Sequence, residues 1–169
     1  MVDKGYLDYL KELFVVKYPR SLLKIINRGI PGDTAEGGLA RLRRHVLASE
    51  PDLVFVQFGL NDAFSGCSVE SFARNIIGII SGIQKASSAE ILLMTSGALE
   101  DREYEIAGPF YERLAEVARQ QSIPIALVHR YWEQKIAGGV SFDTLVQADR
   151  VHPTTEGYRL MAEAVVEKF

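Results

Sequence analysis

Two residues near the carboxyl end of the chain, Asp149 and His152, have the types and the spacing of a general-base pair. At three positions apart, the aspartate can accept a hydrogen bond from Nδ1 of the imidazole. That bond fixes the tautomer, stabilises the imidazolium and leaves Nε2 to take a proton. Pro153 and Thr154 follow, and then an amphipathic helical pattern. A structural Asp–His pair at the start of a helix is the alternative interpretation.

Two other sequences place hydrogen-bond donors directly after short apolar runs. Residues 27–34 read Asn-Arg-Gly-Ile-Pro-Gly-Asp-Thr, where glycines permit a tight turn whose backbone N–H groups can face a ligand. Residues 59–62 read Gly-Leu-Asn-Asp, and the carboxamide of Asn61 can donate to an oxyanion. Ligands of open parallel sheets bind beyond the carboxyl ends of the strands, which is where both loops are expected. Taken singly, each has a structural alternative, a helix cap at Asp33 or Thr34 and an Asx turn at Asn61.

In their order and spacing, three segments resemble the second, third and fifth sequence blocks of the SGNH (GDSL-type) hydrolases. They are NRGIPGDT, FGLND and DRVHPTTEGYRLMAEAV, and the resemblance spans nearly the whole chain. It implies that Gly32, through its backbone N–H, and Asn61, through its side chain, are oxyanion-hole donors. It also implies that His152 is the base and Asp149 its orienting partner, in a Ser-His-Asp mechanism that hydrolyses small-molecule acyl esters.

The first block of that family, a Gly-Asp-Ser sequence after the first strand, supplies the nucleophile, and we find no such block in the chain. We therefore expect that the chain begins too late to contain the nucleophilic serine. Ser65, Ser68 and Ser96 follow strand patterns, but none lies in a sharp glycine-flanked turn, so we expect them to cap loops or to contact solvent. Cys67 is the better intrinsic nucleophile, yet its neighbours Gly66 and Ser68 offer neither a base nor a positive charge.

Two functions stay open on the sequence alone. The first is an ester hydrolase of acyl esterase, lipase or thioesterase lineage, whose intact form acylates a serine and releases an alcohol or thiol. The alternative is a catalytically inactive binding module of the same fold, or the product of a gene whose start codon lies further upstream. Loss of the serine from such a triad costs about a million-fold in turnover, so we expect these residues alone to be almost inactive. The chain has no Cys/His cluster, HExxH pattern or phosphate loop, so we expect neither a metal nor a cofactor.

Other chemically capable side chains have structural explanations. His45 follows the arginine-rich stretch 41–44, which we expect to form a solvated face, and His129 ends a strand pattern, so we expect both histidines to be structural. Three aromatic residues lie at strand ends or helix starts, where they could line an acyl or alcohol pocket or pack in the core. They are Tyr104, Tyr131 and Trp132.

Short β-rich runs alternate with amphipathic helical patterns along the chain, which is typical of βαβ units. The runs are continuous enough in apolar residues to be strands buried on both faces. The pattern predicts an α/β fold, a doubly wound parallel sheet with helices on both faces, in the manner of a flavodoxin-like three-layer sandwich. The expected strands are 22–26, 53–58, 90–95 and 124–128, and the expected helices include 39–46, 69–83, 110–117 and the segment after Thr154.

The first strand of that sheet is apparently missing, because the chain opens with helical spacing from Tyr6 to Phe14. In the strand order 2-1-3-4-5 the first strand lies between the second and the third. We therefore expect a gap between 22–26 and 53–58, because direct pairing of these two strands would draw the predicted site loops too close together. Unpaired ladder groups are costly when buried, so we expect the gap to be filled. A strand from a second molecule could fill it, but an upstream segment is the expectation we favour.

Length and composition predict one compact domain over residues 1–169, with 47% hydrophobic residues to form a core. A net charge of -3 gives no basic field for a phosphate backbone, so we expect no nucleic-acid partner. The single Cys67 cannot form an intrachain disulfide. Charged residues interrupt any signal-like run near the amino end, and the apolar run 53–60 is too short to span a membrane. These features predict a cytoplasmic protein and leave its oligomeric state open.

Overall fold

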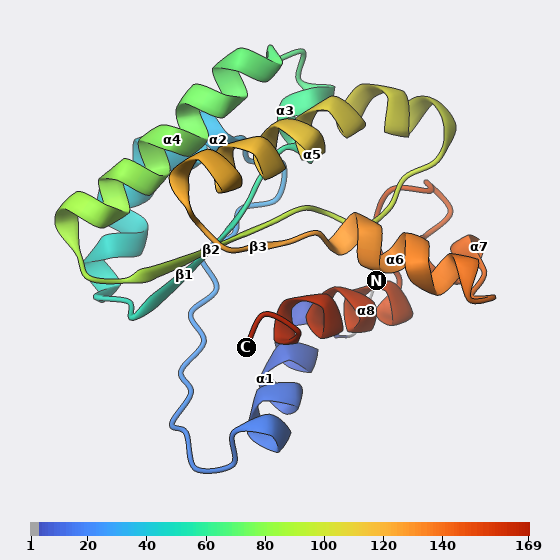
Figure 1. The fold of residues 1–169 in the computed structure, drawn as a ribbon, viewed down its shortest axis with the longest axis horizontal. Helices are drawn as coiled ribbons and strands as arrows, with labels where there is room; N and C mark the ends of the chain where they lie inside the picture. Colours follow the sequence, from blue (N-terminus) through green and yellow to red (C-terminus); the bar gives the residue numbers. More distant parts are fainter. Residues whose placement is uncertain (1–3) are drawn as a thin grey trace. The chain divides into compact units, whose positions relative to one another are not determined.

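The computed structural model describes residues 4–169 and has an α/β fold (Figure 1), so residues 1–3 of the expected single domain lie outside the described range. Its sheet has the strand order β1-β2-β3. Strands β1 and β2 are parallel and in register, with Leu53 opposite Glu90 and Gln57 opposite Met94. Parallel neighbours need a crossover connection, and a long helix between them supplies it. The strands are β1 (Leu53–Gln57), β2 (Glu90–Met94) and β3 (Ile125–Ala126).

One compact unit, the sheet unit, consists of residues 28–95 and 102–125. Every residue of β2 from Ile91 to Met94 is buried, so this strand is covered on both faces, as expected from its continuous apolar run. The long helix after β1 buries a stripe at helical spacing, from Phe72 to Ile83. The helices of this unit are α2 (Ala35–Arg41), α3 (Leu60–Phe64), α4 (Val69–Ala86) and nearly all of α5 (Asp101–Gln121), with a π-helical turn (Leu42–Val46) and a 3-10 turn (Leu47–Ser49) after α2.

Two glycines of α4 let α2 and the π-helical turn pack closely against it. A Cβ on Gly78 would lie 2.9 Å from Cδ2 of Leu39, and a Cβ on Gly82 would lie 2.8 Å from Cδ2 of Leu42. Both distances are shorter than real Cβ contacts, so a larger residue at either position would require the end of a leucine side chain to move. The predicted helix 39–46 corresponds to the end of α2 and to the π-helical turn that continues it.

A second compact unit, the α8 unit, consists of described residues up to 27 together with 96–101 and 126–169. Its helices α1, α6 and α7 all contact α8, and Figure 1 shows α1 and α8 side by side. A Cβ on Gly157 of α8 would lie 2.2 Å from the backbone oxygen of Leu145 and 2.8 Å from the ring of Trp132, so only glycine fits this contact. These helices are α1 (Tyr6–Lys17), α6 (Val128–Ala137), α7 (Phe142–Leu145) and α8 (Thr155–Val166). Both units draw on distant segments of the chain, and their organisation as one domain stays a prediction.

The prediction of a strand at 22–26 is wrong. These residues take no part in the sheet, and Leu22 is 105% exposed, while Leu23 and Ile26 are 42% and 40% exposed. A β-rich composition reflects how well side chains fit a half-buried pleated surface and sets no backbone conformation by itself. The expected cost of unpaired ladder groups on this segment therefore does not arise, because solvent reaches it.

The predicted strand 124–128 is shortened to the two residues of β3, because α6 begins at Val128. Helix α3 was not predicted, since five residues are too few to show a helical period. Among the described residues, none of the helices combines the length and the hydrophobicity that a transmembrane segment needs.

Candidate active site

The loop before α2 contains a tight turn that requires glycine. The N–H of Asp33 donates to the oxygen of Ile30 at 3.1 Å, and Gly32 has a φ of 76°. Pro31 followed by a glycine of positive φ is the arrangement of a type II turn. An added Cβ on Gly32 would meet no atom within 4 Å, so the glycine serves the backbone conformation. Gly32 is exposed, and its N–H makes no hydrogen bond within the described part of the chain.

The carboxamide of Asn61 is held against this turn. Gly59, with a φ of 117°, ends the run of β1 and allows α3 to begin. Nδ2 of Asn61 then donates to the backbone oxygen of Asp33 at 3.0 Å. A carboxamide nitrogen carries two hydrogens, and this bond uses one of them. The structure thus brings the two expected donors, Gly32 and Asn61, to the same pair of loops, with one Asn61 hydrogen left for a ligand.

Asp62 ties the same two loops together from the inside. Its side chain is 0% exposed, with Oδ1 accepting the N–H of Ala35 at 2.9 Å and Oδ2 accepting the N–H of Gly59 at 3.0 Å. Burial raises the pKa of this carboxyl, and the amide hydrogen bonds oppose that rise. In the sequence, Asp62 is only a carboxylate after a strand pattern, and its part in joining the two loops is seen in the structure alone.

Arg41, at the end of α2, stabilises the turn at Gly32. Its Nε lies 2.7 Å from Oδ2 of Asp33, both side chains being 15% exposed, and its Nη1 donates to the oxygen of Arg28 at 2.7 Å. The expectation of a solvated arginine face at 41–44 is therefore wrong for Arg41, because α2 turns this side chain toward the loop. Thr34 also caps α2, accepting the N–H of Gly37 at 3.4 Å, so the loop is both a cap and a candidate site.

Asp149 and His152 are joined directly in the α8 unit. Nδ1 of the imidazole lies 2.7 Å from Oδ2 of Asp149. The other oxygen, Oδ1, accepts the N–H groups of Val151 and His152, each at 2.9 Å. These amide bonds are the main reason that the pKa of Asp149 is lowered to about 2. Within residues 4–169, Nε2 of His152 makes no hydrogen bond, and the side chain is 67% exposed.

The loop that carries this pair is held at several points. Val146 and Pro153 form an antiparallel bridge, and the N–H of Gln147 donates to the oxygen of His152 at 2.8 Å. In sequence, Arg150 lies between Asp149 and His152. It has a φ of 60°, an unusual conformation for a residue with a side chain. Its guanidinium binds Asp143, with Nη1 and Oδ1 2.7 Å apart, and also forms an ion pair with Glu100. The loop is therefore fixed by backbone pairing and by ion pairs of one arginine.

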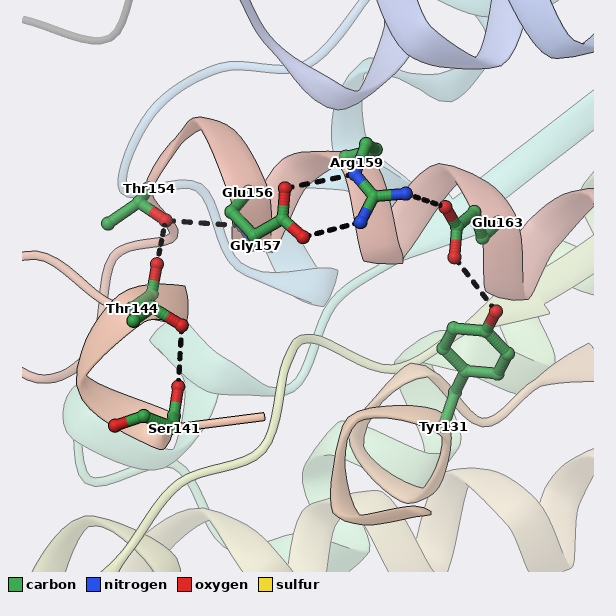
Figure 2. Close-up of polar contacts among 8 residues, drawn as sticks. All are labelled: Tyr131, Ser141, Thr144, Thr154, Glu156, Gly157, Arg159 and Glu163. Atoms are coloured by element: carbon green, nitrogen blue, oxygen red, sulfur yellow. Dashed lines mark hydrogen bonds and ion pairs between the residues drawn. The ribbon is translucent and has the colours of Figure 1, made fainter. Parts of the chain in front are cut away.

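The start of α8 anchors the other end of the loop, as Figure 2 shows. Oγ1 of Thr154 accepts the N–H of Gly157 at 3.2 Å and donates to the oxygen of Thr144 at 2.7 Å. Further along α8, Arg159 forms ion pairs with Glu156 and Glu163 (Figure 2). The Thr154 hydroxyl thus fixes α8 directly after Pro153.

The aromatic residues and the two other histidines named from the sequence differ in their exposure. The hydroxyl of Tyr131 donates to Oε2 of Glu163 at 2.9 Å, and burial with this carboxylate raises its pKa. Trp132 is 0% exposed, which favours core packing over a pocket lining. His129 is buried, whereas His45 and Tyr104 are exposed.

Among the described residues, none of the substitute nucleophiles has a hydrogen bond to a histidine. The hydroxyl of Ser65 donates to the oxygen of Asp62 at 2.9 Å, and Ser68 caps α4 by accepting the N–H of Ser71 at 3.2 Å. Ser96 is half-buried without a hydrogen bond in the described structure. Burial is the first cause of a raised pKa at Cys67, so its thiol stays protonated and is a poor nucleophile. In the same described range, no three His, Cys, Asp or Glu side chains gather as metal ligands would.

Comparison with known proteins gives consistent results. The profile of the GDSL-like Lipase/Acylhydrolase family matches residues 1–160. The chain is 25% identical to an acetylxylan esterase of Geobacillus stearothermophilus over 181 residues, which cover 97% of the chain and 80% of the relative. It is 29% identical to an arylesterase of Vibrio mimicus over 176 residues, covering 99% of the chain and 83% of the relative. The crystal structure of the Geobacillus stearothermophilus acetylxylan esterase has the same fold, with a TM-score of 0.87 at 21% identity over 98% of this chain and 80% of that one.

Proposed function

This chain belongs to the GDSL-like lipase/acylhydrolase family, and from that membership we propose that it carries the oxyanion donors and the base pair of a serine ester hydrolase. The observation that carries the proposal is the hydrogen bond of 2.7 Å between Asp149 and His152, which leaves Nε2 of the imidazole without a partner in the described residues. The substrates we propose are small-molecule acyl esters. Residues 1–169 contain no Gly-Asp-Ser sequence, so we propose that they do not hydrolyse esters by themselves.

The proposed reaction uses His152 as a proton shuttle. A serine hydroxyl attacks the acyl carbonyl carbon while Nε2 of His152 takes the hydroxyl proton, and the imidazolium then gives this proton to the departing alcohol. Water next attacks the acyl-enzyme with the same nitrogen as base, which releases the acid and restores the serine. Asp149, with its pKa at about 2, stays ionised throughout and stabilises the imidazolium.

The proposed oxyanion hole uses the free N–H of Gly32 and the second hydrogen of Asn61. Both groups are neutral donors, and their positions are set before substrate binds by the bonds of Asn61 to Asp33 and of Asp62 to both loops. Donors fixed in advance stabilise the tetrahedral intermediate without a reorganisation cost. Removal of one such donor typically slows turnover by about 10²- to 10³-fold.

A relative supports the assignment of the base pair. Solved structures of the Geobacillus stearothermophilus acetylxylan esterase include catalytic mutants in which a serine, an aspartate or a histidine is replaced by alanine. In that protein the aspartate lies three positions before the histidine. Asp149 and His152 have the same spacing.

The absence of a Gly-Asp-Ser sequence also favours a second function, an inactive binding module. Fluorophosphonate labelling and a panel of p-nitrophenyl esters separate the two. We expect the 169-residue chain to be silent in both assays, because no activated serine is present. A version extended at its amino end by a strand and a Gly-Asp-Ser turn should label and hydrolyse if the ester-hydrolase proposal holds. A folded but inert extended version would favour the binding module, and labelling of the original chain that His152→Ala abolishes would overturn the proposed lack of a nucleophile.

A further inference from the structure

The turn of residues 149–152 holds Asp149 and His152 through its backbone as well as through their side chains. Oδ1 of Asp149 accepts the N–H groups of Val151 and His152, each at 2.9 Å, while Oδ2 lies 2.7 Å from Nδ1 of the imidazole. The convergence of two successive N–H groups on one oxygen is typical of a turn that contains a residue in the left-handed conformation. Arg150 is that residue, with a φ of 60°. The position of the carboxylate therefore depends on the backbone of Arg150.

This conformation is unfavourable for an arginine. The left-handed region costs a residue with a Cβ a factor of about ten in an equilibrium, whereas glycine enters it freely. The N–H of Arg150 donates to the oxygen of Gln147 at 2.9 Å, which gives the turn one backbone bond. The remaining contacts that can offset the strain come from the arginine side chain.

The guanidinium of Arg150 joins two carboxylates from different segments of the α8 unit. Its Nη1 lies 2.7 Å from Oδ1 of Asp143 in α7, and its Nη2 forms an ion pair with Glu100 in the loop after β2. The guanidinium carbon lies 5.1 Å from the ring centroid of Phe142. An exposed ion pair or cation–π contact changes an equilibrium by up to about five-fold, so the three contacts together can match the cost of the positive φ.

We propose that Arg150 is a positioning residue for His152. Its side-chain contacts hold the positive φ, and the positive φ holds the carboxylate of Asp149 in place. The carboxylate in turn keeps the proton of the neutral imidazole on Nδ1, so Nε2 is unprotonated, as a general base requires. The inference rests on the proposed function for the role of His152 as the base, and it adds the residue that sets the tautomer of this base.

The tautomer of His152 in the 169-residue chain tests the proposal without any need for catalysis. The ¹⁵N shifts of the two ring nitrogens, recorded at a pH where the imidazole is neutral, report how the proton is shared between Nδ1 and Nε2. We expect the Nδ1–H form to predominate at His152. His45 is exposed and its ring makes no hydrogen bond within residues 4–169, so it serves as the reference imidazole in the same sample.

Three variants separate the side chain of Arg150 from its backbone. Arg150→Ala removes the contacts and keeps the strain, so the ratio of Nδ1–H to Nε2–H at His152 should fall by about ten-fold, the worth of one hydrogen bond to a charged group. Glu100→Gln/Asp143→Asn keeps the arginine, replaces both carboxylates by neutral amides and should lower the ratio as well. Arg150→Gly also loses the contacts but adopts the φ without strain, so it should bring the ratio back toward that of the unchanged chain.

The matched control is Glu133→Gln/Glu167→Gln. It neutralises two exposed carboxylates of the same unit whose oxygens make no hydrogen bond in the described structure. This variant should leave the ratio at His152 unchanged, and the ring signals of His45 should stay in place in every variant.

Four results would overturn the inference. They are a predominance of Nε2–H at His152 in the unchanged chain, an unchanged ratio in Arg150→Ala, an unchanged ratio in Glu100→Gln/Asp143→Asn, and a ratio in Arg150→Gly as low as that in Arg150→Ala. An Arg150→Ala chain that is less stable but keeps the ratio would show that the arginine supports the fold alone. The failure of the proposed function is a separate outcome, because a folded, extended chain that hydrolyses no ester would refute catalysis while the tautomer would still report on Arg150.

Discussion

Replacement of Asp62 by alanine should loosen both loops of the proposed oxyanion hole at once. The carboxylate is fully buried and accepts the N–H groups of Ala35 and Gly59. Without it, both donors are left in a buried place with no acceptor, at about 1 to 3 kcal/mol each. We expect a loss of about 3 kcal/mol in the free energy of unfolding, a large share of the roughly 5 to 15 kcal/mol by which a domain is stable. Asp62→Asn keeps one acceptor oxygen and should cost about half as much.

Urea unfolding followed by circular dichroism measures this change, with Asp52→Ala as the matched control. Asp52 is exposed and its side chain has no partner in the described structure, so its loss should stay within about 0.5 kcal/mol. In the same variants, the amide resonances of Gly32 and Asn61 should shift for Asp62→Ala and stay in place for Asp52→Ala. An Asp62→Ala protein as stable as the control, with these two resonances unmoved, would refute the role of Asp62 as the tie between the loops.

Three further perturbations bear on the base pair and the turn. The pKa of Asp149 is about 2 in the folded chain, below its ordinary value. The ionised carboxylate therefore stabilises the fold above pH 4, and this contribution is lost as the pH falls from about 4 to about 2. In acid unfolding, the Asp149→Asn variant should lack the loss of stability between these two pH values. Gly32→Ala should lower the free energy of unfolding by about 1 to 2 kcal/mol in urea, because a φ of 76° strains any residue with a Cβ while the space beside it is open. Arg150→Gly should melt at a higher temperature than Arg150→Ala, because both lose the same ion pairs and only glycine relieves the φ of 60°; equal melting temperatures would show that the loop stores no strain there.

The buried elements of the sheet unit were predictable because their apolar residues follow the periods of regular structure. The stripe of α4 repeats at three and four residues, and β2 is a continuous apolar run, so helix and strand follow without tertiary information. Residues 22–26 have the same composition as a strand and form none, because a strand also needs a partner that composition does not supply. The family resemblance singled out Gly32, Asn61, Asp149 and His152 from short motifs, and their roles stay a proposal.

The supports of the site were not predictable in the same way. Asp62 accepts a hydrogen bond from Ala35, which is 27 residues away in sequence. Arg41 binds Asp33, which is 8 residues away. Such contacts depend on how the turn at Gly32 and the end of β1 meet in space, which no local period encodes. The positive φ of Arg150 likewise follows from the ion pairs and backbone bridge of its loop, since the residue type itself disfavours it.

The most direct test of the central claim is the rate of p-nitrophenyl acetate hydrolysis by a chimera. Its amino end would be the segment of the Geobacillus stearothermophilus acetylxylan esterase that carries the serine replaced in that protein's catalytic mutant. We expect hydrolysis that Asn61→Ala slows by about 10²- to 10³-fold and that His152→Ala slows by on the order of 10⁴-fold or more. A folded chimera that hydrolyses the ester equally well with and without His152 would contradict it.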